Sequence, residues 1–216
     1  MDPFRLCMAL GPAAVYLLLL GAINLSRRPF LVSGARDAAA LGLALSGFFF
    51  VGPFELFVPD TAVARFGPYV WLLLLAFYAL CLVLVLLVLR PRLIIYNMSA
   101  DQLRTILAHL VEQLDTEARW AGDSLALPSL GVQLHLENLA AMRNVSLIST
   151  GPHQDYSGWR RLELALAAAL SRVEVPRNPR GASLFTAGIV IVAALVVSIA
   201  RDPQAVAQQL IDLLRL

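Results

Sequence analysis

Residues 71–89 read WLLLLAFYALCLVLVLLVL, and this run decides the class of the protein. The uncharged stretch that contains it extends over residues 66–89. An α-helix needs about 20 consecutive apolar residues to cross the hydrocarbon core of a bilayer, so the stretch predicts a transmembrane helix. Three further apolar stretches of similar length predict additional spans, at residues 6–25, 38–58 and 182–201.

The composition of the whole chain agrees with this prediction. Hydrophobic residues make up 59% of the chain and charged residues 15%, whereas a soluble domain is about 45–50% apolar and about 25% charged. The net charge of +2 lacks the basic surplus of a nucleic-acid-binding protein, so we expect no nucleic-acid partner. All 17 basic residues are arginine, a usage typical of a GC-rich bacterial genome.

The first apolar stretch has two readings, a membrane helix or a cleaved signal peptide. A signal peptide carries its positive charge before the apolar run. Here the leader contains Asp2 and Arg5, and the basic pair Arg27 and Arg28 follows the run instead. We therefore expect residues 6–25 to remain as a membrane helix.

The distribution of arginine predicts the orientation of the spans. The flanks on one side carry seven arginines, and those on the other side carry four. The first set is Arg27, Arg28, Arg36, Arg90, Arg92, Arg177 and Arg180, and the second is Arg5, Arg65, Arg201 and Arg215. Because cytoplasmic flanks are enriched in basic residues, we expect a multi-pass protein of the cell (inner) membrane with both termini outside. Residues 90–180 are then cytoplasmic.

Residues 90–180 form a separate block between the membrane domain at 1–89 and the fourth span. The block carries ten arginines and nine acidic residues and is long enough for one small core. A β-branched run at 92–96 predicts a strand, and Ser99 with Gln102 forms a capping box that predicts a helix start. The apolar positions of that helix share one face: Leu103, Ile106, Leu107, Leu110, Val111 and Leu114.

Three or four strands and a second helix complete the predicted domain. Segments 118–120 and 124–127 predict a hairpin, residues 132–137 alternate between apolar and polar, and 144–149 predict a further strand. Asp155 predicts the start of a helix whose apolar face comprises Trp159, Leu162, Leu166, Leu170 and Val173. The expected fold is an integral membrane α-helical protein with four transmembrane helices and a cytosolic two-layer α+β domain inserted between helices 3 and 4.

The segment 202–216 follows the fourth span and has an amphipathic pattern. Val206, Leu210 and Leu213 fall on one face, and Gln204 and Gln208 fall on the other. We expect this helix to lie on the outer membrane surface. The alternative is that its apolar face docks onto a partner subunit.

The sequence shows no set of residues typical of an enzyme. His109, His135 and His153 lie in different predicted elements, and no metal, phosphate-binding or nucleophile motif occurs in a suitable setting. Cys7 and Cys81 both lie within apolar runs and have no partner at metal-ligand spacing. We therefore expect no catalytic activity, no cofactor and no metal.

Glu55 is the one carboxylate inside a predicted span. Ionisable residues in a bilayer are costly and are functional candidates by default. Glu55 lies between Pro53 and Pro59, where a disturbed helix frees backbone carbonyls that could help bind a proton or a cation. The alternative is that Glu55 reaches interfacial water or pairs with Arg65, since carboxylates near the end of a span are less costly.

Three other groups of residues are candidates for binding. The seven arginines of the predicted cytoplasmic flanks are candidate contacts for anionic lipids. The enrichment of basic residues in cytoplasmic flanks also explains them without any lipid binding. The polar side of the 132–137 strand, formed by Gln133, His135 and Glu137, is a candidate partner face on an otherwise open sheet. Ala38, Gly42 and Ser46 form a small-residue stripe that permits close helix packing, within the chain or with another copy.

These features favour a non-catalytic membrane protein, an accessory, assembly or regulatory subunit of a membrane complex. Its expected partners are the lipid bilayer and other subunits, or a second copy of the chain, bound through the cytosolic domain. The alternative is a small transporter or ion-conducting component that uses Glu55. Against the alternative, the other spans are almost wholly apolar, and no internal repeat is present.

Overall fold

The computed structural model describes residues 3–52, 69–139, 142–152, 154–201, 203–204 and 206–208. The chain divides into two compact units. Unit 1 comprises Met1–Leu20, Ala39–Val88 and Ser183–Leu216, and unit 2 comprises Gly21–Ala38 and Leu89–Ala182.

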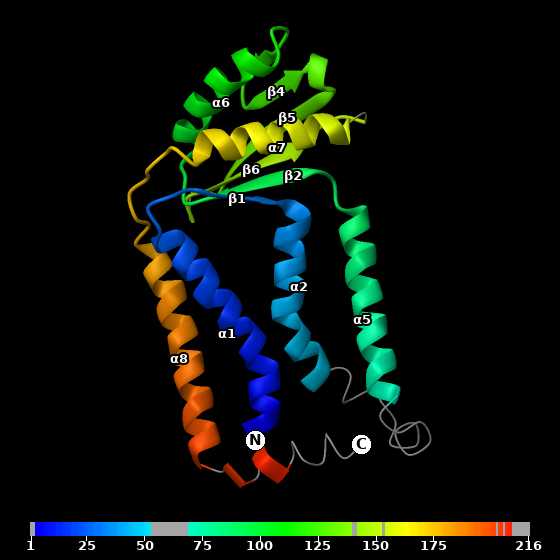
Figure 1. Cartoon of the computed structure of the whole chain (residues 1–216), viewed down its shortest axis with the longest axis vertical. Coiled ribbons are helices and arrows are strands. Elements are labelled where there is room, and N and C mark those ends of the chain that lie inside the picture. The colour runs from blue at the N-terminus through cyan, green and yellow to red at the C-terminus, as the bar shows by residue number, and fades with distance from the viewer. Residues whose placement is uncertain are drawn as a thin grey trace. The chain divides into compact units, whose positions relative to one another are not determined.

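Unit 1 is built from four helices that are long and apolar enough to cross a membrane (Figure 1). They are α1 (Pro3–Leu25), α2 (Gly34–Val51), α5 (Tyr69–Val88) and α8 (Arg180–Arg201), of which α1, α2 and α8 also contribute their ends to unit 2. At most 17% of the most apolar window of any of these helices is buried. Among the described residues, most side chains in these windows are therefore not covered by other parts of the chain.

The helix bounds differ in detail from the predicted spans. The helix α2 begins at Gly34, before the span predicted at 38–58, because Asp37 in its first turn interacts favourably with the positive end of the helix dipole. Residues 53–58 and 66–68, and with them Glu55, lie outside the described residues. Of the predicted amphipathic segment 202–216, residues 203, 204 and 206–208 are helical, and the others lie outside the described part.

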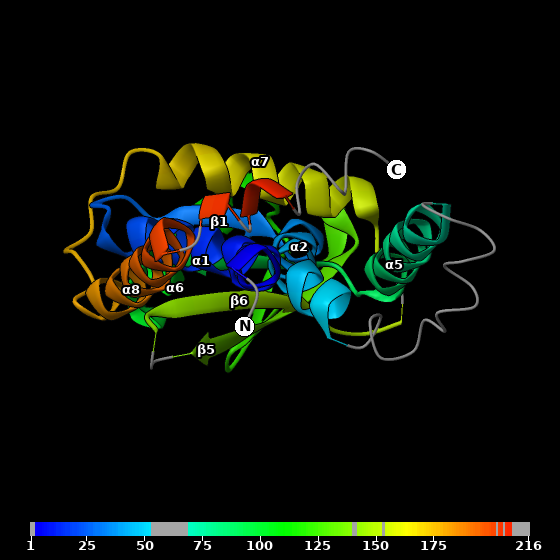
Figure 2. The same cartoon turned by 90° about the horizontal axis from the view of Figure 1, so that it is seen from below.

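Glycines permit close packing between neighbouring helices of unit 1. A Cβ atom on Gly47 of α2 would clash with the backbone oxygen of Met8 in α1, and one on Gly188 of α8 would lie 2.8 Å from Leu18. Gly42 of α2 lies against Leu82 of α5 in the same way. The helices are consequently arranged in the order α8, α1, α2, α5 (Figures 1 and 2).

Unit 2 contains a six-stranded antiparallel sheet among its described residues. The strand order is β1-β2-β6-β5-β4-β3. The bounds are β1 Phe30–Ser33, β2 Arg92–Tyr96, β3 Arg119–Ala121, β4 Ser124–Leu127, β5 Val132–Leu139 and β6 Asn144–Ser149.

Strand β1 is the main difference from the sequence-based expectation. It comes from the connection between α1 and α2, which the sequence analysis assigned to no strand, and it pairs with β2 in the register Phe30↔Tyr96 to Ser33↔Leu93. A run of four residues after a proline gives no strand signal by itself. The pairing depends on a partner far along the chain, so local patterns do not reveal it.

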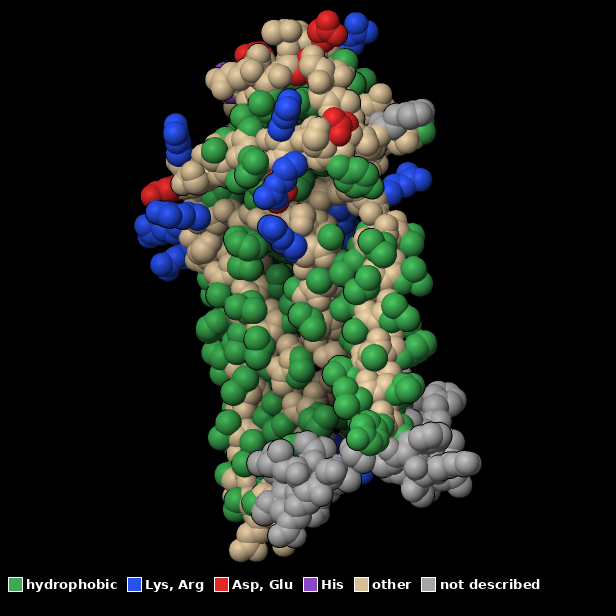
Figure 3. Space-filling model, turned by 45° about the vertical axis from the view of Figure 1, so that its right-hand side comes forward, with side chains coloured by type: hydrophobic (Ala, Val, Ile, Leu, Met, Phe, Trp, Pro, Cys, Tyr) green, Lys and Arg blue, Asp and Glu red, His purple; other side chains and the backbone are tan. Residues whose placement is uncertain are grey.

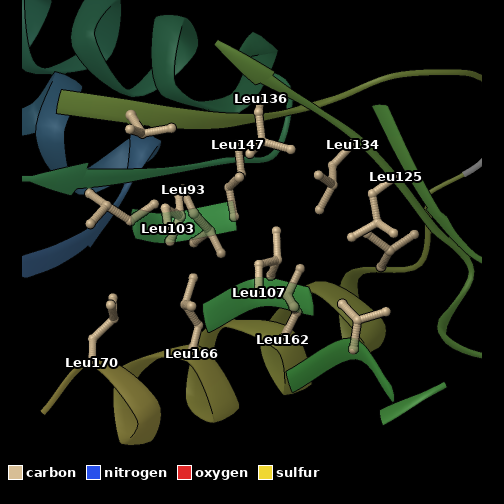
Figure 4. Close-up of a cluster of buried hydrophobic side chains, with 14 of the residues drawn as sticks. Leu93, Leu103, Leu107, Leu125, Leu134, Leu136, Leu147, Leu162, Leu166 and Leu170 are labelled. Atoms are coloured by element: carbon tan, nitrogen blue, oxygen red, sulfur yellow. The ribbon is translucent and has the colours of Figure 1, made fainter. Parts of the chain in front are cut away.

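Two helices cover one face of the sheet. They are α6 (Ala100–Leu114) and α7 (Tyr156–Leu170), and Figure 4 shows leucines from both helices and from the sheet pointing toward one another. The apolar faces predicted for both helices are confirmed, since their central positions are buried in one core: Leu103, Leu107, Val111, Trp159, Leu162, Leu166 and Leu170. The sheet contributes alternate residues to the same core, among them Leu93, Leu125, Leu134 and Leu147.

The predicted helix starts are also confirmed. At α6 the backbone N–H of Ser99 donates to the Gln102 side chain at 3.4 Å, as a capping box requires. At α7 the Asp155 carboxylate accepts from the backbone N–H and the hydroxyl of Ser157 at 2.8 and 2.7 Å. These hydrogen bonds from Ser157 lower the pKa of Asp155.

Asp115 closes the other end of α6 and ties it to the turn between β4 and β5. Its carboxylate accepts from Ser129 N–H at 2.8 Å, from the Ser129 hydroxyl at 2.7 Å and from Glu117 N–H at 2.9 Å. Burial by itself raises the pKa of this carboxyl group, but the hydrogen bonds from Ser129, Glu117 and Leu130 outweigh burial and lower it.

This arrangement predicts an acid-sensitive fold. Because the pKa of Asp115 is lower in the folded state, its contribution to stability is present above the ordinary aspartate pKa of about 4 and is lost as the pH falls through the folded value. We expect Asp115→Asn to lower the thermal midpoint at pH 7 and to reduce its fall between about pH 5 and pH 3. Tryptophan fluorescence of the full chain in detergent measures both. Glu112→Gln on the exposed side of α6 is the control, and an equal effect of the two variants would contradict the assignment.

Candidate functional site

The open side of β5 presents polar side chains opposite the helix-covered core. Gln133, His135 and Glu137 are exposed, and they alternate with the buried residues Val132, Leu134 and Leu136. A strand places successive side chains on opposite faces, so the three polar residues share one surface. The structure thus brings together the three residues that the sequence analysis proposed as a partner face.

On this face, His135 has a polar neighbour on β4 and an apolar neighbour on β6. The Ser124 hydroxyl of β4 lies 3.0 Å from His135 Nδ1, and the register places Ile148 of β6 on the other side of His135. The Gln154 side chain holds the backbone of Gln133 through hydrogen bonds of 3.1 and 3.3 Å. Rigid donors and acceptors lie beside an imidazole on an open sheet, an arrangement that can recognise a polar surface of another protein.

The β2 end of the same sheet face is closed within unit 2. The Tyr96 hydroxyl donates to the carboxylate of Asp37 in the first turn of α2, and the Arg92 guanidinium lies 4.0 Å from that carboxylate. Gly34 lies directly against the Arg92 side chain, where a Cβ atom would meet Arg92 Cγ. The accessible polar surface is therefore on β5 and β4.

All seven arginines proposed as anionic-lipid contacts belong to unit 2. Six of them are exposed, and Arg92 is half-buried beside Asp37. Arg36 lies 3.8 Å from Glu163 of α7, a pairing that the sequence did not reveal. Among the described residues, no ion pair involves Arg27, Arg28, Arg90 or Arg177.

Four buried asparagines form a feature that the sequence analysis missed. Asn24, Asn97, Asn144 and Asn178 are between 0% and 8% exposed, which is unusual for an amide side chain. The Asn178 amide donates to Asn24 Oδ1 at 3.2 Å and to the Met142 carbonyl at 2.9 Å. The Asn97 amide donates to the Ser26 carbonyl at 2.7 Å. These bonds join the end of α1, the β5–β6 turn, the end of β2 and the start of α8.

Two sequence signals pointed to these asparagines. Asn24 interrupts the apolar pattern at the end of the first span, and Asn97 lies just after the predicted 92–96 strand. Asn97 has a positive φ of 62°, a left-handed conformation that asparagine tolerates better than most residues. Neither signal names the partner, because the hydrogen bonds connect segments far apart in the chain.

The remaining candidates are dispersed. Gly42 lies against Leu82 and accepts a hydrogen bond from Tyr78 through its carbonyl, and the Ser46 hydroxyl donates to Leu43 of its own helix. Ala38, the first residue of that stripe, belongs to unit 2.

His109 is exposed on α6, whereas Glu55 and His153 lie outside the described residues. In the described part of the chain, Cys7 and Cys81 are free thiols, and no group of three potential metal ligands is found.

The fold and its surface define a class: a protein with four helices of membrane-spanning length and an antiparallel sheet covered on one face by two helices. Comparison with known protein families, curated proteins and solved structures gave no match to this chain.

Proposed function

We propose that the chain is a non-catalytic, multi-pass membrane protein that serves as an accessory, assembly or regulatory subunit of a membrane complex. It binds a partner subunit through the polar side of β5, at Gln133, His135 and Glu137. Unit 2 lies on the cytoplasmic side of the cell (inner) membrane, and both termini lie outside.

The uncovered apolar surface of the four helices is the observation that carries the membrane assignment. No residue of α5 is buried, and large side chains such as Leu73, Leu87 and Val88 are more than 70% exposed. Figure 3 shows hydrophobic side chains over the helices and charged side chains gathered on unit 2. A surface of this extent is stable in lipid and aggregates in water.

The charges within the helices favour an accessory role over ion conduction. In the described parts of α1, α2, α5 and α8, aspartate, glutamate, arginine and histidine occur only near helix ends, at Arg5, Arg36, Asp37, Arg180 and Arg201. A conducting path needs polar or ionisable groups that face its interior at depth. The described residues offer no such series, whereas they do offer an exposed polar sheet face.

Cysteine accessibility tests the membrane placement. In a Cys7→Ser/Cys81→Ser background, Gln113→Cys on α6 and Gln204→Cys after α8 each introduce one exposed thiol. We expect a membrane-impermeant maleimide to label Gln204→Cys in intact cells and Gln113→Cys only after lysis. Labelling in the opposite order reverses the orientation, and release of the chain by an alkaline carbonate wash overturns the membrane assignment.

Charge reversal on the sheet tests partner binding in the same membranes. We expect Glu137→Arg to remove a partner that otherwise stays with the protein through mild detergent extraction, and Glu112→Arg on α6 to retain it. Loss of partner in both variants, or in neither, contradicts a role for the β5 surface. If Glu55→Gln instead abolishes an ion-dependent activity while assembly is normal, the conducting alternative replaces the proposal.

A further inference from the structure

We propose that unit 2 contains a binding site for the phosphate of an anionic phospholipid headgroup, where the end of α1, the β5–β6 turn and the start of α8 meet. This surface, the basic junction, comprises Arg27, Arg28, Arg143, Arg177 and Arg180. The inference rests on the proposed membrane placement and adds a ligand class to it.

Backbone hydrogen bonds bring the three segments of the basic junction together. Val175 N–H donates to the Arg27 carbonyl at 2.8 Å, and Asn178 N–H donates to the Asn24 carbonyl at 3.1 Å. The guanidinium of Arg143 donates to the Pro176 carbonyl at 3.3 Å. Arginines that are far apart in the chain therefore lie on adjoining segments.

The buried asparagines make this junction rigid. The Asn178 amide reaches both Asn24 and the Met142 carbonyl, and its Oδ1 accepts from Arg180 N–H at 3.1 Å at the start of α8. The Arg143 carbonyl accepts from Met98 N–H at 2.7 Å. A fixed backbone positions the arginine stems before any ligand arrives, which reduces the entropy lost on binding.

The basic junction has a large excess of positive over negative charge. Arg27, Arg28, Arg177 and Arg180 are exposed, and Arg143 is half-buried. The segments that form the junction contribute one carboxylate, Glu174, against these five arginines. An excess of positive charge on adjoining segments favours a bound anion.

The enrichment of arginine in the cytoplasmic flanks of spans does not account for the whole basic junction. Arg27, Arg28, Arg177 and Arg180 flank predicted spans, but Arg143 lies in the middle of residues 90–180, away from every span in sequence. It joins the others only through the fold. A basic residue brought to this place by tertiary structure indicates a local use for the charge.

The position and the chemistry together point to a lipid. The junction includes the last turn of α1 and the first residues of α8. In the proposed membrane placement these helix ends lie at the headgroup layer. Guanidinium groups bind phosphate oxygens through paired, charge-assisted hydrogen bonds, and the cytoplasmic leaflet carries anionic headgroups. Phosphatidylglycerol offers that phosphate without a compensating amine.

Lipid retention by the purified full chain in neutral detergent tests the site. Native mass spectrometry compares phosphatidylglycerol with phosphatidylcholine for the wild type, for Arg27→Gln/Arg28→Gln/Arg143→Gln/Arg177→Gln, and for a control that loses the same charge at Arg104, Arg119, Arg160 and Arg161. We expect the junction variant to lose phosphatidylglycerol affinity by about tenfold or more, and the control to change by about twofold at most.

Two further measurements keep the test decisive. If the quadruple variant fails to fold, the triple Arg27→Gln/Arg28→Gln/Arg177→Gln variant retains the Arg143 hydrogen bond and is expected to lose most of the affinity. Arg143→Lys keeps the charge but loses the paired donors, and a partial loss is expected.

The outcomes separate this inference from the proposed function. Equal losses in the junction and control variants, or equal binding of phosphatidylcholine, overturn the site. Displacement of the lipid by millimolar inorganic phosphate assigns the junction to a soluble phosphate and overturns the lipid. If the chain resists carbonate extraction but does not prefer phosphatidylglycerol, the lipid site is overturned and the membrane assignment stands. If carbonate removes the chain from the membrane, both the membrane assignment and the lipid site are overturned.

Discussion

Replacing Leu162 by alanine is expected to lower the free energy of unfolding of unit 2 by about 2–5 kcal/mol. Leu162 is fully buried on α7, among leucines from α6 and from the sheet (Figure 4). Truncation removes its transfer free energy and leaves a cavity in a close-packed core. Urea denaturation of the full chain in detergent, followed by tryptophan fluorescence, measures the change.

Leu164→Ala provides the matched control for this prediction. Leu164 lies two residues further along α7 and is 57% exposed, so the same substitution removes little buried surface. We expect a change of within about 0.5 kcal/mol. If both variants lose similar stability, α7 does not pack on the sheet through the face that contains Leu162.

The second large effect is expected at Asn178, which is 1% exposed. Asn178→Ala leaves Asn24 Oδ1, the Met142 carbonyl and the Arg180 N–H without their side-chain partner. Because a buried polar group that loses its hydrogen bond keeps the full cost of desolvation, we expect a loss of about 2–4 kcal/mol in the free energy of unfolding.

An exposed asparagine of the same unit controls for the loss of the amide itself. Asn138 lies on β5 and is exposed, so Asn138→Ala is expected to change stability by less than about 0.5 kcal/mol. The same urea titration compares the two variants. A loss under about 1 kcal/mol for Asn178→Ala would mean that the asparagines do not hold the junction together.

Local patterns were sufficient for most elements of both units, though not for β1. The apolar face of α6 repeats with the helical period, and Val132, Leu134 and Leu136 alternate with polar residues along β5. Ser99 and Asp155 identify helix starts because their caps involve residues only two or three positions away. The partner face was predicted for the same reason, since alternation along one strand places its three residues on one side.

Contacts between distant segments could not be predicted in this way. Strand β1 pairs with β2 although α2 and α5 separate them in the chain, and Asn24 bonds to Asn178, which lies 154 residues away. Arg143 gave no signal at all, because a lone arginine in a turn is ordinary. Arg143 becomes a candidate binding residue only because the fold places it beside the segments that carry Arg27 and Arg177.

The sequence by itself determined that four helices are apolar enough to span a membrane and that strands and two amphipathic helices lie between the third and the fourth in the chain. Hydrophobic length and periodicity are properties of consecutive residues, so no other part of the chain is needed to define them. Only the tertiary structure decided that the α1–α2 connection enters the sheet and that buried asparagines join the ends of α1 and α8. Those features depend on hydrogen bonds whose partners become neighbours only after the chain has folded.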